Sequence, residues 1–437
     1  MTDIVEVTLW GTRVGHIGYA SGQTALSSFE YAANFRQMGV EISPLKMPTS
    51  TALHAFADIS QRTFKGLAGV FADSLPDKFG NQLIDLYFAD KSIPPENIST
   101  LDRILYIGDR GMGALEYHPA VALSGEHNYA GALDVAHLAD LANRVTSNRA
   151  SLRDRLEQAV SREQALRFIR VGSSAGGARS KALVATAADG TLKDGTVDHG
   201  IDHQYWLLKF DGAHNSDRDN ADPVGMPRVE YIYSIIARDC GIQIPSTAFI
   251  ELDGSFHFLI ERFDRITRNG KLNKLHYVSW SGIAHADRDT TGAFSYEQLA
   301  LTIKQLNLGQ TALTELFRRA VFNIVGRNQD DHTKNFGFLM DRQGHWSLAP
   351  AFDMTYSFDP TGLWTQVHQI RLAGKQDHFA LDDLLAFAQS CNLKKRAAID
   401  IVKRTASAFQ RFDALAKEYQ VPNALRETIG RNLRLKL

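Results

Sequence analysis

A dense group of polar residues follows a run whose apolar residues have helical spacing. Asn328-Gln-Asp-Asp-His-Thr-Lys-Asn335 comes directly after that run. Asp330 and Asn335 are five positions apart, and an isolated carboxylate, Asp353, follows a second apolar segment. Magnesium prefers oxygen ligands of these types, and a carboxylate can orient an attacking hydroxyl group. Together these residues could support magnesium-dependent phosphoryl transfer.

The order of these residues matches the protein-kinase template. There an aspartate accepts the substrate's hydroxyl proton, an asparagine five residues later binds magnesium, and a second aspartate after a hairpin binds metal. This predicts Asp330 as the base and Asn335 and Asp353 as metal ligands. The sequence departs from the template at two points. Met-Thr follows Asp353 where the template has Phe-Gly, and no His-Arg precedes Asp330. Asp331 is the rival base, and we otherwise interpret it as a solvated turn residue.

Two further residues of this group have open roles. His332 is a candidate ligand or phosphate contact, and a histidine that only orders the loop is an equal alternative. Lys334 is placed to neutralise the transferring phosphoryl group. A solvated, charged turn is the alternative for the whole group.

A loop of small residues, Val171 to Lys181, precedes a lysine in an apolar strand. We expect strands at Leu166 to Val171 and Lys181 to Thr186 on either side of it, and its backbone amides could approach phosphates closely. Lys209 must either reach solvent or meet an anion such as the phosphates of ATP. Glu230, at the start of the next helix, could position it, or could be an exposed helix-start residue.

The chain then leaves the sheet at Phe258 to Arg265. In this segment a hinge would offer backbone groups to adenine, although Phe263 could simply be core. The first 120 or so residues alternate extended runs, Ile104 to Ile107 among them, with turns and one helix that opens near Phe71 to Asp77. A helical connector is expected over residues 137–167.

The later elements form a β-rich part followed by an α-rich part. The β-rich part contains expected strands at 205–210, 248–252 and 256–260 and a helix near 230–239. From Tyr296 onward the pattern is almost wholly helical, interrupted by one hairpin over 336–348. Nucleotide chemistry is expected between the two parts.

Composition excludes several classes of protein. The 437 residues carry a formal net charge of −1, which gives no global attraction to nucleic acid or membrane. No stretch reaches the roughly 18 apolar residues of a membrane span, so we expect a cytoplasmic protein with no membrane partner. Cys240 and Cys391 are expected as buried free thiols. Residues 394–437 carry a net charge of +7 on two expected helices.

The motifs together resemble the HipA family of toxin kinases. The most specific are Ser174-Ala-Gly-Gly-Ala-Arg-Ser-Lys181, Ile260-Glu-Arg-Phe-Asp-Arg265, Asp330-Asp-His-Thr-Lys-Asn-Phe336 and Leu348-Ala-Pro-Ala-Phe-Asp353. Ser28-Phe-Glu-Tyr31, Leu75-Pro-Asp77 and Gly111-Met-Gly-Ala-Leu115 resemble that family's first domain.

The resemblance implies an α+β fold: a protein-kinase-like bilobal fold, with a β-rich N-lobe and an all-helical C-lobe, preceded by a small mixed α/β domain. We predict boundaries at 1–140, 141–265 and 266–437. It also implies ATP and Mg²⁺ as cofactors, and a set of ATP-binding residues: Gly176, Gly177, Ala178, Arg179, Ser180, Lys181, Lys209, Glu261, Arg262, Phe263, His332 and Lys334. Ser174 matches the family's inhibitory autophosphorylation site, with Ser173 as its competitor.

The resemblance further implies a serine/threonine kinase that acts as the toxin of a type II toxin–antitoxin system. Its expected partners are a small helix-turn-helix antitoxin of HipB type and, through that antitoxin, operator DNA. The protein substrate is not fixed by motifs, although the family's best-studied member phosphorylates a glutamate tRNA synthetase. Two alternatives stay open: a DNA-binding regulator that retains the kinase fold, and a metal-dependent nuclease.

Overall fold

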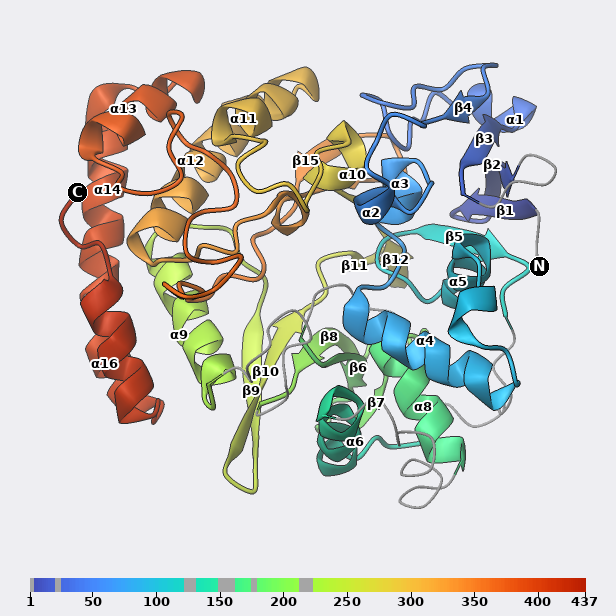
Figure 1. The fold of residues 1–437 in the computed structure, drawn as a ribbon, viewed down its shortest axis with the longest axis horizontal. Helices are drawn as coiled ribbons and strands as arrows, with labels where there is room; N and C mark the ends of the chain where they lie inside the picture. Colours follow the sequence, from blue (N-terminus) through green and yellow to red (C-terminus); the bar gives the residue numbers. More distant parts are fainter. Residues whose placement is uncertain (1–3, 20–24, 122–130, 148–161, 174–178, 212–222) are drawn as a thin grey trace.

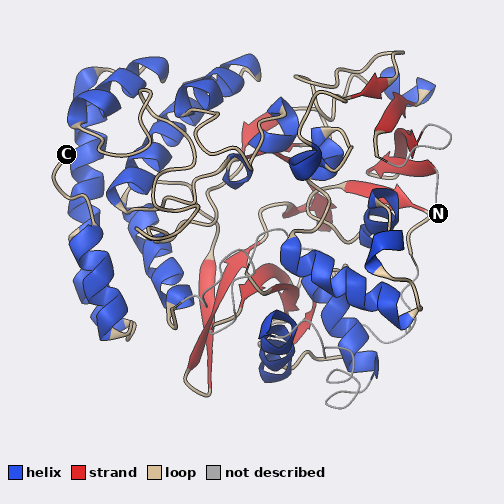
Figure 2. Ribbon diagram, viewed as in Figure 1, coloured by secondary structure: helices blue, strands red, loops and turns tan. Residues whose placement is uncertain are grey.

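The structure is a computed structural model that describes residues 4–19, 25–121, 131–147, 162–173, 179–211 and 223–437. The C-terminal helices, orange to red in Figure 1, form one end of the molecule. The two larger sheets lie in the middle and toward the other end (Figure 2).

The first 118 residues form a mixed unit built on a five-stranded antiparallel sheet of order β4-β3-β2-β1-β5. Its strands are β1 Ile4–Leu9, β2 Thr12–Tyr19, β3 Ser27–Tyr31, β4 His54–Ala55 and β5 Leu115–His118. Its helices are α1 Ala33–Arg36, α2 Gln61–Phe64, α3 Gly69–Ala72, α4 Lys78–Asp90, η1 Pro95–Asn97 and α5 Thr100–Ile107.

One extended run predicted in this unit is wrong. Residues 104–107 are the end of α5, which begins with a capping box between Ser99 and Asp102. That cap outweighs the strand propensity of a four-residue apolar run. The helix predicted near Asp77 is confirmed as α4, because the Asp77 side chain accepts a hydrogen bond from the Gly80 N–H as N-cap.

The middle of the chain forms a second antiparallel sheet of order β7-β6-β8-β10-β9. Its strands are β6 Lys181–Thr186, β7 Leu192–Asp194, β8 Gln204–Lys209, β9 Thr247–Leu252 and β10 Ser255–Glu261. The accompanying helices are α6 Val135–Ser147, α8 Arg162–Ser173 and α9 Met226–Asp239.

The strand predicted at Leu166 to Val171 is also wrong, because these residues lie in α8. The helix packs between α4 and β6, and its residues 168–171 are all buried, including Arg170. A six-residue segment in which Arg167 and Arg170 interrupt the apolar residues is too short for its pattern to distinguish a buried helix from a strand. The β9–β10 hairpin is confirmed, with positive φ at Asp253 and Gly254 in its two-residue turn.

The last 170 residues are mainly helical and carry two small sheets. Their strands are β11 Arg265–Arg268, β12 Lys271–Lys274, β13 His276–Ser279, β14 Gly337–Met340 and β15 Trp346–Leu348. Their helices are α10 Trp280–Ala284, α11 Tyr296–Gln305, α12 Gly309–Val325, η2 Thr333–Asn335, α13 Leu381–Ser390, α14 Lys395–Phe409, α15 Phe412–Glu418 and α16 Asn423–Asn432.

The predicted hairpin over 336–348 is present, and β13 adds a third strand to it. Two details of the prediction are corrected. Residues 349–380 contain no helix, because their backbone is tied instead to loops and side chains around the polar group at 328–335. Residues 394–437 form three helices, not two. Cys240 and Cys391 are buried free thiols as expected.

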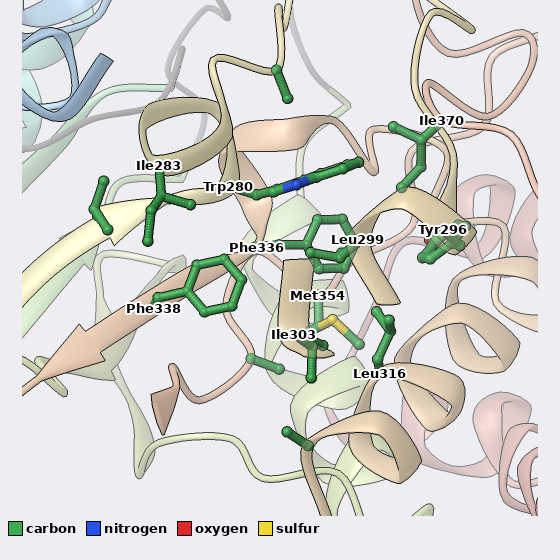
Figure 3. Close-up of a cluster of buried hydrophobic side chains, with 14 of the residues drawn as sticks. Trp280, Ile283, Tyr296, Leu299, Ile303, Leu316, Phe336, Phe338, Met354 and Ile370 are labelled. Carbon is green, nitrogen blue, oxygen red and sulfur yellow. The ribbon is translucent and has the colours of Figure 1, made fainter. Parts of the chain in front are cut away.

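Two hydrophobic cores join parts that are distant in sequence. The first combines the N-terminal sheet with the helical half, and the second packs α4 and α5 against α6, α8 and the middle sheet. Both cross the predicted domain boundaries. Figure 3 shows part of the first core, where Phe336 and Met354 point into one cluster beside Trp280. These two residues directly follow Asn335 and Asp353, so the core anchors both predicted metal ligands.

Candidate active site

Lys209 lies at the centre of a buried charged cluster. It ends β8, and its Nζ lies 2.5 Å from Oε1 of Glu230 on α9 and also donates to Oδ1 of Asp353. Burial alone would lower the pKa of Lys209, but the Asp353 and Glu230 carboxylates outweigh it and raise that pKa. The lysine therefore meets an anion and stays charged. Glu230 is buried, which removes the exposed helix-start alternative.

Asp353 faces this cluster from an unusual backbone position. Its φ is +52°, a left-handed conformation that non-glycine residues seldom adopt and that often marks a functional site. Burial would raise the pKa of Asp353, but the ammonium groups of Lys209 and Lys181 lower it to about 2. The carboxylate is therefore ionised at neutral pH, as a metal ligand must be.

Asp330 and Asn335 are joined by their own loop. The Asn335 Nδ2 donates to the Asp330 carbonyl oxygen at 2.7 Å, which leaves the amide oxygen for another partner. The Asp330 N–H donates to Ser357 Oγ at 3.0 Å, while the Asp330 side chain is 48% exposed. The loop is thus held by its backbone and presents its carboxylate outward, where a substrate hydroxyl can reach it.

A hydrogen-bond network behind these residues connects the two loops, and no sequence pattern indicated it. Asn328 donates through Nδ2 to Asn323 Oδ1 at 3.0 Å and to the Asp353 carbonyl at 3.3 Å, and accepts from Ser357 Oγ at 3.0 Å. Ser357 in turn accepts from Asp330. One asparagine and one serine therefore set the position of the predicted base relative to the predicted metal ligand.

Asp331 is a buried structural residue, so its interpretation as a solvated turn residue is wrong. Its carboxylate accepts hydrogen bonds from the Tyr296 hydroxyl at 2.7 Å, His368 Nδ1 at 2.8 Å and the Gln369 N–H at 2.8 Å. A carboxylate with these three donors and no exposure cannot meet a protein substrate. It fixes the loop from which Asp330 projects.

His332 and Lys334 belong to the same loop as Asp330 and Asn335. Burial, assisted by Arg288, lowers the pKa of His332 to about 3, so this imidazole is neutral, and its Nε2 is 3.9 Å from Asp330 Oδ1. Burial also lowers the pKa of Lys334, and the Asp73 carboxylate of the N-terminal unit opposes that shift. A neutral His332 could donate a hydrogen bond but could not supply positive charge.

The small-residue loop lies partly outside the described residues, which include neither Ser174 nor Gly176, Gly177 and Ala178. Of its described part, Arg179 Nη1 lies 3.8 Å from Glu230 Oε2. Lys181 is buried close to Asp353 and its Nζ is 3.3 Å from Asp77 Oδ2. The Ser180 hydroxyl is fully buried and has no hydrogen-bond partner among the described residues. A buried orphan hydroxyl between cationic residues fits the phosphate oxygens of ATP.

The predicted hinge is only partly free to contact a nucleotide. The Arg262 guanidinium forms a buried ion pair with Asp264 at 2.8 Å, and the Arg262 N–H donates to the Tyr205 carbonyl at 2.8 Å. The Phe263 ring packs near Tyr277 and Phe352. Adenine binding by residues 261–263 stays a prediction, and the Arg262 side chain serves the fold instead.

Magnesium fits the available oxygens. In the described part of the chain, no group of three or more His, Cys, Asp or Glu is placed to hold a metal ion. Mg²⁺ does not require one, because it commonly takes one or two protein oxygens and completes its shell with water and phosphate. Asn335 and Asp353 suffice for this mode. A metal-dependent nuclease that used Asp330, Asp331, His332 and Asp353 would need a ligand cluster that the described residues do not form. No described helix is long and apolar enough to cross a membrane.

Comparison with known proteins gives matches along most of the chain. Residues 173–412 match the HipA-like C-terminal domain, and residues 5–118 match the HipA N-terminal domain. A putative kinase of Haemophilus influenzae is 30% identical over 132 residues, which are 27% of this chain and 37% of that protein. Putative kinase Y4dM of Sinorhizobium fredii is 24% identical over 218 residues, 47% of this chain and 50% of that one. The chain therefore spans half or less of these relatives.

The fold is similar to that of HipA from Shewanella oneidensis MR-1, solved with HipB and its operator DNA. The TM-score is 0.66 at 16% identity, covering 98% of this chain and 94% of that one. This confirms the predicted α+β, kinase-like bilobal fold class. Because the HipA-like C-terminal domain alone matches more than half of the sequence, the chain belongs to the HipA family.

Proposed function

We propose that this chain is an ATP- and Mg²⁺-dependent serine/threonine protein kinase that acts as the toxin of a type II toxin–antitoxin system. The observation that carries the proposal is the contact of the buried Lys209 with both Glu230 and Asp353. Protein kinases use a lysine–glutamate pair to hold nucleotide phosphates and a nearby aspartate to hold metal. A DNA-binding regulator that kept the fold without catalysis would not need this cluster of Lys209, Glu230 and Asp353.

Each residue then has a defined role. Asp330, outward-facing and ionisable, orients the substrate hydroxyl and accepts its proton. Asn335 and Asp353 hold Mg²⁺, which neutralises charge on the phosphates when bound. Lys209 and Lys181 hold the phosphate oxygens in a water-poor site, where fixed charges are most effective.

Inhibitory autophosphorylation at Ser174 is part of this proposal. The described neighbour Ser173 supports the choice, because its hydroxyl is fully buried and donates to the Arg170 carbonyl oxygen at 3.3 Å. A kinase acting between molecules would need that hydroxyl exposed. A phosphate at Ser174 would add about −1.5 to −2 charges beside a site built for anions, so it would repel ATP.

The proposed partners are a helix-turn-helix antitoxin of HipB type and, through it, operator DNA. The similar Shewanella protein suggests both, because it was solved in complex with HipB and its operator DNA. The proposed protein substrate is a cellular protein, with a tRNA synthetase as the example the family offers. Pull-down from the native host would identify both partner classes.

Incubation of the purified protein with γ-labelled ATP and Mg²⁺ tests the function. We expect label on the protein itself, at Ser174 by mass spectrometry, and on a cellular protein in extract. A regulator that only binds DNA would transfer no label, and a nuclease would instead cleave nucleic acid without ATP. Either result would overturn the proposal, whereas label at Ser173 or Ser180 alone would overturn only the site assignment.

A further inference from the structure

The N-terminal unit reaches the phosphate site through Asp77. This residue precedes α4, and its two carboxylate oxygens have different partners. Oδ1 accepts from the Gly80 N–H at 3.0 Å as the helix N-cap, while Oδ2 lies 3.3 Å from Lys181 Nζ. Both side chains are buried, with 3% of Lys181 and 9% of Asp77 exposed.

Lys181 lies directly opposite Lys209 in the sheet. The two residues are register partners of the antiparallel β6–β8 pair, so their side chains share one face. Both ammonium groups lower the pKa of the same carboxylate, Asp353. Two buried like charges at this spacing need compensating anions. Glu230 supplies one to Lys209, and Asp77 supplies the other to Lys181.

The same helix also holds the opposite end of the small-residue segment. A Cβ on Gly80 would lie 3.0 Å from the Ser173 carbonyl oxygen, and one on Gly172 would lie 2.7 Å from Leu83 Cδ1. Glycine at position 80 permits this close approach, which brings the α4 backbone directly against the end of α8. The N-terminal unit therefore contacts the chain on both sides of residues 174–180, at Ser173 and at Lys181.

Helix capping alone does not account for a carboxylate at position 77. One acceptor oxygen satisfies the Gly80 N–H, and asparagine or serine caps a helix about as well as aspartate. A buried negative charge is costly unless a cation meets it. The helix dipole stabilises this charge only modestly, whereas Lys181 supplies a full opposite charge at 3.3 Å.

We propose that Asp77 is a positioning residue for the ATP phosphates: it holds the Lys181 ammonium group in place, as Glu230 does for Lys209. The inference rests on the proposed kinase function and deepens it. It makes the N-terminal unit a structural part of the nucleotide site, because one of the two phosphate-facing lysines is oriented from outside the kinase lobes. Loss of the Asp77 charge removes the carboxylate that orients Lys181 towards the phosphates.

The test compares ATP with adenosine, which has the base and sugar but no phosphates. Asp77→Asn keeps the helix cap and removes the charge, and Asp77→Ser provides a second neutral cap should the first variant fold poorly. Isothermal titration of the full chain with Mg-ATP should give about tenfold weaker binding for these variants, as loss of an orienting partner does at metal sites. Adenosine affinity should equal that of the wild type.

Two controls separate positioning from folding. Ser99→Ala removes the N-cap of α5 in the same unit without touching Lys181, so it should lower the melting temperature and leave ATP affinity unchanged. Adding Asp77→Asn to Lys181→Gln should cause no further loss of ATP affinity, because the two residues act as one unit.

Unchanged or tighter ATP binding by Asp77→Asn would overturn the inference, as would an equal loss of adenosine affinity. A wild-type protein that binds no Mg-ATP would refute the proposed function itself. The two failures are therefore distinguishable.

Discussion

Two adjacent carboxylates, Asp330 and Asp331, have opposite surroundings. The first is half exposed and held by its backbone, and the second is buried under three hydrogen-bond donors. Spacing from Asn335 singles out Asp330, which is the carboxylate that solvent can reach. Spacing could not reveal the burial of Asp331, because Tyr296 and His368 lie 35 and 37 residues away in the chain.

A partly buried histidine, His285, gives the protein a predictable acid sensitivity. His285 Nε2 accepts a hydrogen bond from the Gly69 N–H at 3.1 Å, which joins α3 to the end of α10. Burial, with Lys46 assisting, lowers the pKa of His285 to about 4. An unfolded histidine titrates near ~6.5, so the unfolded state binds more protons between these two values.

The free energy of unfolding should therefore fall as the pH falls below about 6.5, by about 1.4 kcal/mol per pH unit from His285 alone. His285→Asn tolerates the positive φ of +54° and cannot titrate, so its stability should depend less steeply on pH by that amount. Urea unfolding at several pH values measures both slopes. Identical slopes would mean that His285 is protonated equally in both states.

At the scale of elements, α4 and α8 are in unusually close contact. Gly80→Ala would push a Cβ to 2.6 Å from Pro76 Cβ and 3.0 Å from the Ser173 carbonyl. We expect a loss of about 1–3 kcal/mol in the free energy of unfolding, typical of overpacking, and weaker ATP binding because Asp77 moves with the helix. Thermal melts and titration with Mg-ATP would measure the two effects.

Gly430→Ala is the matched control, because no atom lies within 4 Å of its Cβ position in α16. Alanine there should raise stability by up to about 1 kcal/mol through helix propensity. If both substitutions have the same small effect, α4 and α8 have room to separate and the close packing carries no constraint.

The elements that can be predicted from sequence are those that end at residues typical of caps and turns. Gly241 with φ +76° ends α9, and Asp253-Gly254 turns the β9–β10 hairpin. The sequence of α8 resembles a strand because its apolar positions reflect burial by α4 and β6, which are tertiary partners. The local pattern of apolar and polar residues does not reveal such a tertiary partner.

At the scale of the whole molecule, the basic C-terminus is less free than its charge of +7 suggests. Arg404 and Arg411 bind Asp239, and Arg434 binds Asp377. Lys394, Lys395 and Arg396 are exposed at the start of α14. These three are the residues we expect to face DNA phosphates if the proposed antitoxin holds the protein on operator DNA.

Neutralising Lys394, Lys395 and Arg396 should reduce the salt dependence of the protein–antitoxin–DNA complex by up to about 0.9 in log–log slope for each phosphate that is no longer bound. Binding titrations at several salt concentrations measure this slope. Lys417→Gln is a suitable control, since its ammonium group is 2.6 Å from Asp413 and away from the start of α14. An unaltered slope in the triple variant would mean that these three side chains are solvated and do not contact DNA.

The long-range organisation of the site could not be predicted from the sequence. The motifs indicate Asp330, Asn335, Asp353 and Lys209, but not the contacts of Asn328 and Ser357 that join the loops of Asp330 and Asp353. The contact between Asp77 and Lys181 spans 104 residues and two units of the fold, and no spacing rule connects them.

The central claim is that Asp330 is the base of a phosphoryl transfer. Single-turnover transfer of γ-labelled phosphate from Mg-ATP, compared between wild type and Asp330→Gln, tests it most directly. The control is Asp253→Asn, an equivalent loss of charge in an exposed hairpin turn that favours asparagine. We predict a loss of about a thousandfold or more in the transfer rate for Asp330→Gln, with ATP binding retained and the control fully active. An Asp330→Gln protein that still transfers phosphate at the wild-type rate would contradict the claim.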